Sequence, residues 1–193
     1  DREERTMGKD RERHLSAVKL ENRDITAVEN PLDFIVEDHS REREVCALID
    51  RLVSAASLKD AEIHQILAFL EDQLPQHLAD EEIDLFPMML ERCDPEDEID
   101  KVIAKLHADH GHALADTPAI IAIIQALDAP DPKLSEVESQ QMAEFAYHAR
   151  RHLTLENAVI LPIARARLTD ADLRTMKIHM LERRGVKPTS ENK

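Results

Sequence analysis

The sequence predicts an all-α protein, namely an antiparallel (up-down-up-down) four-helix bundle with an N-terminal arm and an extra C-terminal helix. Hydrophobic residues make up 42% of the 193 residues, enough for a core, but aromatic residues make up only 3% and only three residues are glycine. A β sandwich or barrel needs more turn glycines and aromatic strand residues, and a phosphate-binding loop needs more glycine. Helix caps and prolines divide the chain into long helical segments joined by short links.

The first half of the chain is expected to hold an extension followed by two long helices. Residues 1–29 are polar and weakly patterned. An asparagine cap followed by proline then predicts a helix from residue 31 to about residue 56. A second helix is expected over about 59–92, with a bend near Pro75, because proline removes a backbone hydrogen bond and clashes with the preceding turn.

The second half repeats the cap-and-proline signal. Asp94 and Pro95 predict the start of a third helix that ends near residue 115. Pro118 is expected to restart this helix as a shorter apolar piece over 119–127, since proline is tolerated in the first turn but not in the interior.

The remaining segments complete the expected bundle. Residues 128–133 have the composition of a linker, and a fourth helix is expected over about 135–167. Thr169 and Asp172 form a capping-box pattern for a last helix that should stop at Gly185. The predicted domains are an N-terminal extension over 1–29, the bundle over 30–168, and a C-terminal helix with its tail over 169–193.

Charge and cysteine content narrow the possible partners and the compartment. The chain has 25 basic and 40 acidic side chains and a formal net charge of −15, which predicts no nucleic-acid partner and no anionic membrane surface. The two cysteines cannot form a disulfide framework. No signal peptide and no membrane-spanning run is apparent, so we expect reduced thiols and a cytoplasmic protein.

A motif of histidine, glutamate four residues later and proline six residues after that occurs twice. Its members are His77, Glu81 and Pro87 in the first copy, and His152, Glu156 and Pro162 in the second. A further histidine preceded by aspartate stands before each copy, at His39 and His110. We therefore expect two similar helical hairpins related by a pseudo-twofold axis.

The helical period places these six side chains on apolar faces. Residues four apart differ by only about 40° in direction, so each histidine shares a face with its glutamate. The face that carries Glu81 should continue to Met88, and the face that carries Glu156 should continue to Val159 and Ile163. Because an unpaired buried carboxylate is costly, the arrangement favours a cation between the two glutamates. The alternative is a metal-free bundle held by buried histidine–glutamate hydrogen bonds.

The donor set limits which metal fits. Imidazole with carboxylate suits iron, manganese or zinc, and six side chains are too many for one tetrahedral zinc ion. Two bridging carboxylates, four imidazoles and an oxo or hydroxo bridge would leave about two of twelve octahedral positions open on a pair of metals. Open positions on neighbouring metals could accept dioxygen, peroxide or nitric oxide.

Other polar side chains near the motifs have open or minor roles. His107 and His148 lie one turn before His110 and His152 and could complete the coordination, although hydrogen bonding or exposure is expected. Glu42 could also coordinate, but Glu42 and Asp38 are better interpreted as acceptors that orient imidazole N–H groups. Cys46 is interpreted as a small buried hydrophobe. The histidines expected on the surface are His14, His64, His112 and His179.

These passages resemble the hemerythrin-like (HHE cation-binding) family over roughly residues 31–168. The resemblance implies a four-helix bundle that holds two iron ions in a non-haem, oxo- or hydroxo-bridged centre. The ligands that it implies are His39, His77, Glu81, His110, His152 and Glu156. Animal oxygen carriers of this family have five histidines, two of them four residues apart on the third helix, whereas Leu106 occupies the position four before His110 here.

Three functions remain open at this point. We favour binding or sensing of dioxygen, or of a related diatomic ligand such as nitric oxide, without net catalysis and therefore without assigned catalytic residues. A di-iron enzyme of ferroxidase or peroxidase type and an iron-dependent structural or regulatory module are the alternatives, and a homodimer is possible. An oxygen pocket would be lined by Ile35, Ile103, Leu106, Phe145 and Val159.

Overall fold

The computed structural model describes residues 25–127 and 133–187. Every regular element among these residues is helical, which confirms the predicted all-α class. Most of the predicted N-terminal extension, the linker residues 128–132, the end of the tail and His14 lie outside the described residues. Within the part described, no helix has the length and apolarity needed to cross a bilayer.

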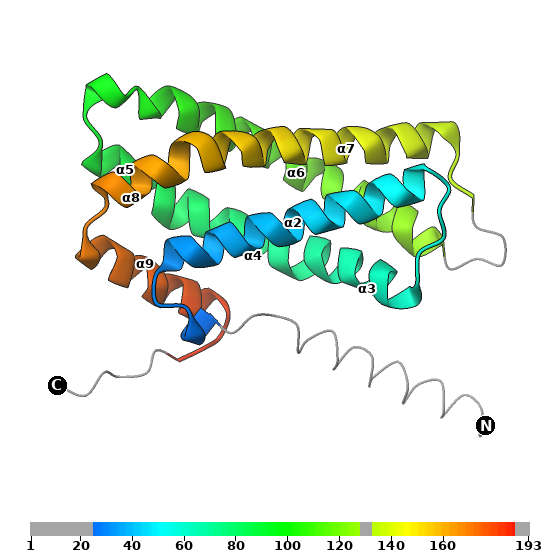
Figure 1. The fold of residues 1–193 in the computed structure, drawn as a ribbon, viewed down its shortest axis with the longest axis horizontal. Coiled ribbons are helices and arrows are strands. Elements are labelled where there is room, and N and C mark those ends of the chain that lie inside the picture. The colour runs from blue at the N-terminus through cyan, green and yellow to red at the C-terminus, as the bar shows by residue number, and fades with distance from the viewer. Residues whose placement is uncertain (1–24, 128–132, 188–193) are drawn as a thin grey trace.

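The helices follow one another along the long axis of the molecule. After a short 3₁₀ turn, η2 (Ile25–Ala27), come α2 (Pro31–Val53), α3 (Asp60–Ala68), η3 (Phe69–Gln73), α4 (Leu74–Asp80), η4 (Glu81–Leu85) and α5 (Phe86–Arg92). The second half contains η5 (Pro95–Asp97), α6 (Ile99–Ala126), α7 (Glu136–Leu155), η6 (Glu156–Ile160), α8 (Leu161–Arg167) and α9 (Asp170–Arg183). Figure 1 shows the chain running out through α2 and α6 and back through α3–α5 and α7–α8, with α9 below.

Capping side chains begin three of these helices where the sequence predicts. The Asn30 side chain accepts a hydrogen bond from the backbone N–H of Leu32 at 2.9 Å, which starts α2. Ser135 and Thr169 form capping boxes at the starts of α7 and α9. Gly185 follows α9 with φ of +68°, a conformation that glycine adopts without the strain of a Cβ atom.

The two predictions for the third helix are wrong. Asp94 and Pro95 begin only the 3₁₀ turn η5, because Glu98 adopts a left-handed conformation (φ 48°) that separates this turn from α6. Pro118 lies inside α6, which continues without a break to Ala126. The missing N–H of a proline removes one hydrogen bond, and the many remaining bonds of this long helix tolerate that loss.

Three π-helical turns in the second and fourth segments each end two residues before a proline. The residue before each proline donates its N–H to a carbonyl five residues back: Leu74 to Phe69, Phe86 to Glu81, and Leu161 to Glu156. The expected bend near Pro75 is therefore a π turn, η3. A π turn accommodates an extra residue and rotates everything that follows it.

Because of this rotation, the residues that face the core after Glu81 and Glu156 stand one position later than the α-helical period predicts. Met89 is fully buried and Met88 is only partly buried, although the α-helical period predicts Met88. In the other copy Ile160 and Ala164 are fully buried, whereas the predicted Val159 and Ile163 are partly buried. The shift is the same in both copies because the π turn occupies the same place in the motif.

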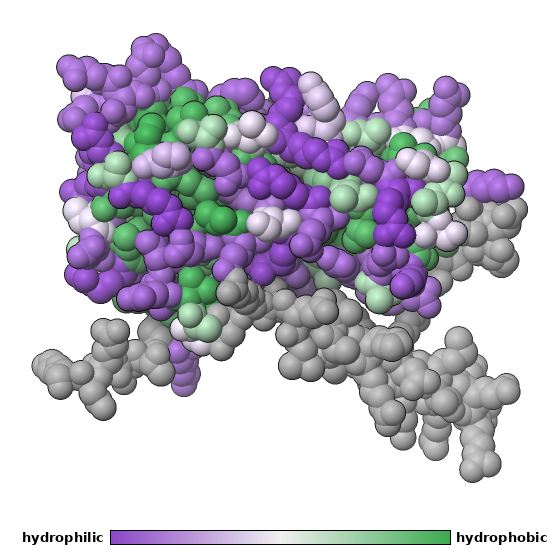
Figure 2. Space-filling model, in the orientation of Figure 1, coloured by the Kyte–Doolittle hydropathy of each residue, from purple (hydrophilic) through white to green (hydrophobic). Residues whose placement is uncertain are grey.

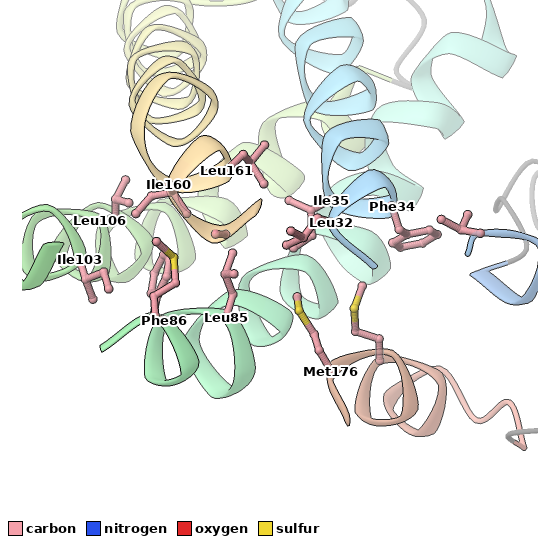
Figure 3. Packing of buried hydrophobic residues seen from close by; sticks show 14 of the residues in the cluster. Leu32, Phe34, Ile35, Leu85, Phe86, Ile103, Leu106, Ile160, Leu161 and Met176 are labelled. Atoms are coloured by element: carbon pink, nitrogen blue, oxygen red, sulfur yellow. The ribbon is translucent and has the colours of Figure 1, made fainter. Parts of the chain in front are cut away.

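Two apolar clusters fill the bundle. The first core cluster includes Leu32, Ile35, Leu85, Phe86, Leu106 and Ile160, and α9 adds Met176 and Met180 to it (Figure 3). The second core cluster includes Val45, Ile49, Ile66, Leu70, Ile120 and Met142. Each long segment crosses from one cluster to the other through a polar stretch that holds its predicted ligands. Outside the core, the face in Figure 2 is mostly hydrophilic.

Candidate metal centre

The six predicted ligands meet between the two core clusters. His39 comes from α2, His77 from α4, His110 from α6 and His152 from α7. The two glutamates, Glu81 and Glu156, are the first residues of the π turns η4 and η6. All six side chains are buried, and His152 is the most exposed of them at 8%.

Each glutamate lies against histidines from three different helices. The Glu156 carboxylate oxygens lie 2.9 Å from Nε2 of His152, 3.2 Å from Nε2 of His39 and 3.5 Å from Nε2 of His110. The Glu81 oxygens lie 3.3 Å from Nε2 of His110, 3.5 Å from Nε2 of His39 and 3.6 Å from Nε2 of His77. The glutamates therefore stand at the centre of the cluster and the imidazoles around it.

The donor atoms form two groups that share both glutamates. His39 and His77 make one group with Glu81 and Glu156, and His110 and His152 make the other with the same two carboxylates. Within each group the donor atoms lie within 4.8 Å of one another. The two groups therefore overlap at the carboxylates of Glu81 and Glu156.

Unsatisfied polar atoms show that the cluster suits a cation. Both oxygens of Glu81 and of Glu156, both ring nitrogens of His77 and Nε2 of His39 are buried without a hydrogen-bond partner among the described residues. The Nε2 atoms of His110 and His152 face each other at 3.1 Å. Buried polar atoms normally have partners, and lone pairs that converge in this way are stabilised by a positive charge between them.

The pKa shifts in the cluster also show that its two carboxylates favour positive charge beside them. Burial disfavours protonated His39, yet the nearby carboxylates of Glu156 and Glu81 outweigh it and raise its pKa to about 10. The same causes raise the pKa of His110 to about 10. Burial raises the pKa of Glu156, but the close imidazoles of His110, His152 and His39 outweigh it and hold the pKa well below its ordinary value. Protons or metal ions can supply this charge, and ligation by imidazole requires the protons to leave.

A family model for the hemerythrin HHE cation-binding domain matches residues 30–164. The chain belongs to the hemerythrin HHE family. The match and the histidine–glutamate cluster together support a cation-binding role. No curated protein matches the chain. The matched range lies inside the predicted bundle domain, and the domain boundaries after residues 29 and 168 stay predictions.

In this hemerythrin domain, three of the four histidines have an outer polar neighbour at Nδ1. His110 donates to Glu82 at 2.5 Å and His39 donates to Asn157 at 3.3 Å. His77 Nδ1 lies 3.6 Å from an oxygen of Asp38. Such neighbours fix the tautomer and the ring orientation of a ligating histidine. Asp38 was expected in this position.

Glu82 and Asn157 were not predicted from the sequence. They follow Glu81 and Glu156 directly, so they occupy the same place in the two copies of the motif. In a regular α-helix with each glutamate facing the core, the next residue points away from the core, so the helical period does not predict a role for it there. The duplicated spacing was the signal that could have found both.

The other flanking residues lie outside both donor groups. His107 and His148 are exposed, and His107 donates to Glu82 at 2.8 Å. Glu42 is buried, and this burial raises its pKa. Cys46 is 1% exposed in the second core cluster, and burial raises the pKa of its thiol to about 12, as a small buried hydrophobe requires.

Three further histidines were expected on the surface. His112 is exposed and His64 is partly exposed. His179 has a side chain that is 43% exposed but pairs through Nδ1 with the buried Asp84. It therefore helps to hold α9 against η4, a role that the sequence did not suggest.

The predicted pocket residues fall on both sides of the centre. Ile35, Ile103 and Leu106 belong to the first core cluster, and Val159 packs against it. Phe145 belongs to the second core cluster. Leu106, which stands where the animal oxygen carriers have a fifth histidine, is fully buried.

Proposed function

We propose that this protein holds two iron ions between Glu81 and Glu156 and binds or senses dioxygen, or a related diatomic ligand such as nitric oxide. The observation that carries the proposal is the sharing of both glutamates by the two donor groups. A mononuclear site would need only one group. Imidazole and carboxylate donors on facing helices of a bundle suit a pair of irons.

The roles of the chain's own residues follow from their positions. Glu81 and Glu156 would bridge the two positions, His39 and His77 would complete one, and His110 and His152 would complete the other. Four imidazoles and two bridging carboxylates leave coordination positions free. Bound iron would supply those positions and the electrons that a dioxygen ligand requires.

The surroundings of the centre favour a small apolar ligand. The first core cluster closes one side with Ile35 and Leu106, both fully buried. The Phe86 ring stacks on His110 with centroids 5.5 Å apart and a 13° interplanar angle. These side chains exclude water from the histidines, and a diatomic gas needs no polar contact to reach them.

An absorption spectrum recorded without and then with oxygen tests this proposal. We expect iron-loaded protein to change its spectrum on oxygenation, to recover on deoxygenation, and to release no hydrogen peroxide. Steady turnover of iron(II) or peroxide would instead support the ferroxidase or peroxidase alternative. A spectrum that does not respond to oxygen or to nitric oxide would contradict ligand binding.

One observation favours an iron-dependent regulatory module as a second candidate. Asp80 and Asp84, each three residues after a predicted ligand, are buried and pair with Arg183 of α9, and Asp80 also pairs with Arg184. The C-terminal helix is thus anchored beside His77 and Glu81. Limited proteolysis tests this candidate: cleavage within α9 should slow when iron is bound, and an identical rate with and without iron would contradict it.

A further inference from the structure

The two halves of the centre carry different groups at equivalent positions. Glu82 follows Glu81, and Asn157 follows Glu156. Each accepts a hydrogen bond from the histidine of the other hairpin, Glu82 from His110 at 2.5 Å and Asn157 from His39 at 3.3 Å. The pseudo-twofold arrangement is therefore kept in geometry, while the acceptor is an acid on one side and an amide on the other.

The identity of the acceptor fixes the histidine tautomer. A carboxylate can only accept, so Nδ1 of His110 carries a proton, and its Nε2 faces Glu81 and Glu156. Asn157 donates its own N–H to the Leu153 carbonyl at 2.7 Å, which turns its oxygen toward His39. Both histidines thus present Nε2 to the centre.

The strength of the two hydrogen bonds differs. Hydrogen bonds to a charged acceptor are shorter and roughly twice as strong as those between neutral groups. A carboxylate behind a ligating imidazole makes that imidazole a more basic ligand. Because Glu82 is charged and Asn157 is neutral, His110 is the more basic ligand and His39 the less basic one.

A second contact holds Glu82 in place. Its other carboxylate oxygen accepts from Nδ1 of His107 at 2.8 Å, and His107 lies one turn before His110 on α6. His107 and His110 of α6 therefore each donate a hydrogen bond to a different oxygen of the Glu82 carboxylate. The side chain of Glu82 is 27% exposed and that of His107 is 74% exposed, so this link reaches from the centre to the surface.

We propose that Glu82 is a positioning residue that fixes the ring of His110. Because one half of the centre has Glu82 where the other half has Asn157, the two cation positions are chemically different. This inference rests on the proposed two-cation centre. It assigns the difference to side chains that do not themselves touch the cations.

Cobalt(II) titration of the metal-free full-length chain tests the inference. Glu82→Gln puts an amide side chain after both glutamates. We expect one of the two stepwise cobalt(II) binding constants to fall about tenfold. The visible absorption should shift only for the cobalt(II) ion bound in that step. Asn157→Asp gives both halves a carboxylate and is expected to strengthen the other step. A purely structural role for Glu82 would lower the melting temperature and leave the ratio of the two constants unchanged.

A matched control is available on the neighbouring π turn. Glu71 of η3 accepts a hydrogen bond from Gln125 of α6 at 3.3 Å, so it also links a π turn to α6 and carries the same charge. Glu71→Gln should leave both cobalt(II) constants and both spectra as in the wild type. Equal constants in Glu82→Gln and Glu71→Gln would overturn the inference.

Two further outcomes separate this inference from the proposed function. Failure of the wild type to bind two cobalt(II) ions would contradict the centre itself, whatever the variants do. If Glu82→Gln does not fold, the zinc-loaded wild type still decides, through one-bond ¹H–¹⁵N correlations of its histidine Nδ1–H groups. We expect the Nδ1 proton of His110 to be further downfield than that of His39, and equal shifts would overturn the inference.

Discussion

Glu81 and Glu156 are fully buried carboxylates whose neighbours are imidazoles rather than arginine or lysine side chains. Their charge has to be balanced inside the bundle, because a buried carboxylate without a partner costs several kcal/mol. A cation that touches both glutamates balances them at once. The two residues are therefore interdependent, and neither can hold a pair of cations alone.

Replacement of either glutamate should empty the centre. In Glu81→Ala or Glu156→Ala the shared bridge is lost, and we expect metal content to fall below one ion per chain by elemental analysis. Glu44→Ala serves as the control, since Glu44 is an exposed acid of α2 and its loss changes the net charge equally. Retention of two ions by both bridge variants would contradict the bridging role.

The sequence contains enough information to bring the six predicted ligands together, because their spacing is repeated and each lies on an apolar helical face. The neighbours at Nδ1 are harder to predict. Asp38 shares a face with the core and was expected, whereas Glu82 and Asn157 reach histidines of another helix from positions beside the core face. Such cross-helix contacts depend on how the helices pack, which periodicity along one helix does not contain.

At the scale of the element, the π turns η4 and η6 decide which side chains enter the core. Each begins at a predicted bridging glutamate and ends just before the residue that precedes proline. The helix breaks were visible in the sequence as prolines, but the extra residue within each turn was not. The α-helical period holds up to the glutamates and is wrong by one residue after them.

Two neighbouring methionines test this shift in register. Met89→Ala should lower the free energy of unfolding by about 2–5 kcal/mol, because Met89 is fully buried in the first core cluster. Met88→Ala makes the same chemical change on a partly buried side chain and should cost about 1 kcal/mol or less. Urea denaturation of both variants measures the difference, and a larger cost for Met88→Ala would show an uninterrupted α-helix.

The start of α9 gives a pH-dependent prediction. Hydrogen bonds from Arg92 and from Thr169 lower the pKa of Asp172 below its ordinary value of 3.8. The lowered pKa means that the stabilisation is fully present above about pH 4 and is lost as the pH falls below it. Asp172→Asn should therefore cost roughly 0.5–1 kcal/mol at pH 7, and the gap to the wild type should close in acid. A gap that stays constant from pH 7 to pH 2 would contradict this account.

At the scale of the whole molecule, two apolar clusters sandwich a charged layer that spans the bundle. The clusters bury the apolar side chains, whereas the layer between them brings carboxylates and imidazoles into close contact. The free energy of unfolding should therefore depend on which cations, protons or metal ions, neutralise the carboxylates of this layer. The overall charge of −15 adds to the attraction for cations.

Removal of metal should loosen the bundle. With free metal at about a hundred times its dissociation constant, each bound ion adds about 2.7 kcal/mol, which is a rise of roughly 5–10 °C per ion in the melting temperature for a chain of this size. Calorimetry of chelator-treated and iron-loaded protein measures this shift. The Glu81→Ala variant should show no shift between the two conditions.

The number of iron ions bound per folded chain tests the central claim most directly. Metal-free protein is loaded with iron(II) under anaerobic conditions, freed of unbound iron on a desalting column, and analysed for iron and protein together. The account predicts two ions per chain. A fully folded wild-type chain that retains one ion or none would contradict it.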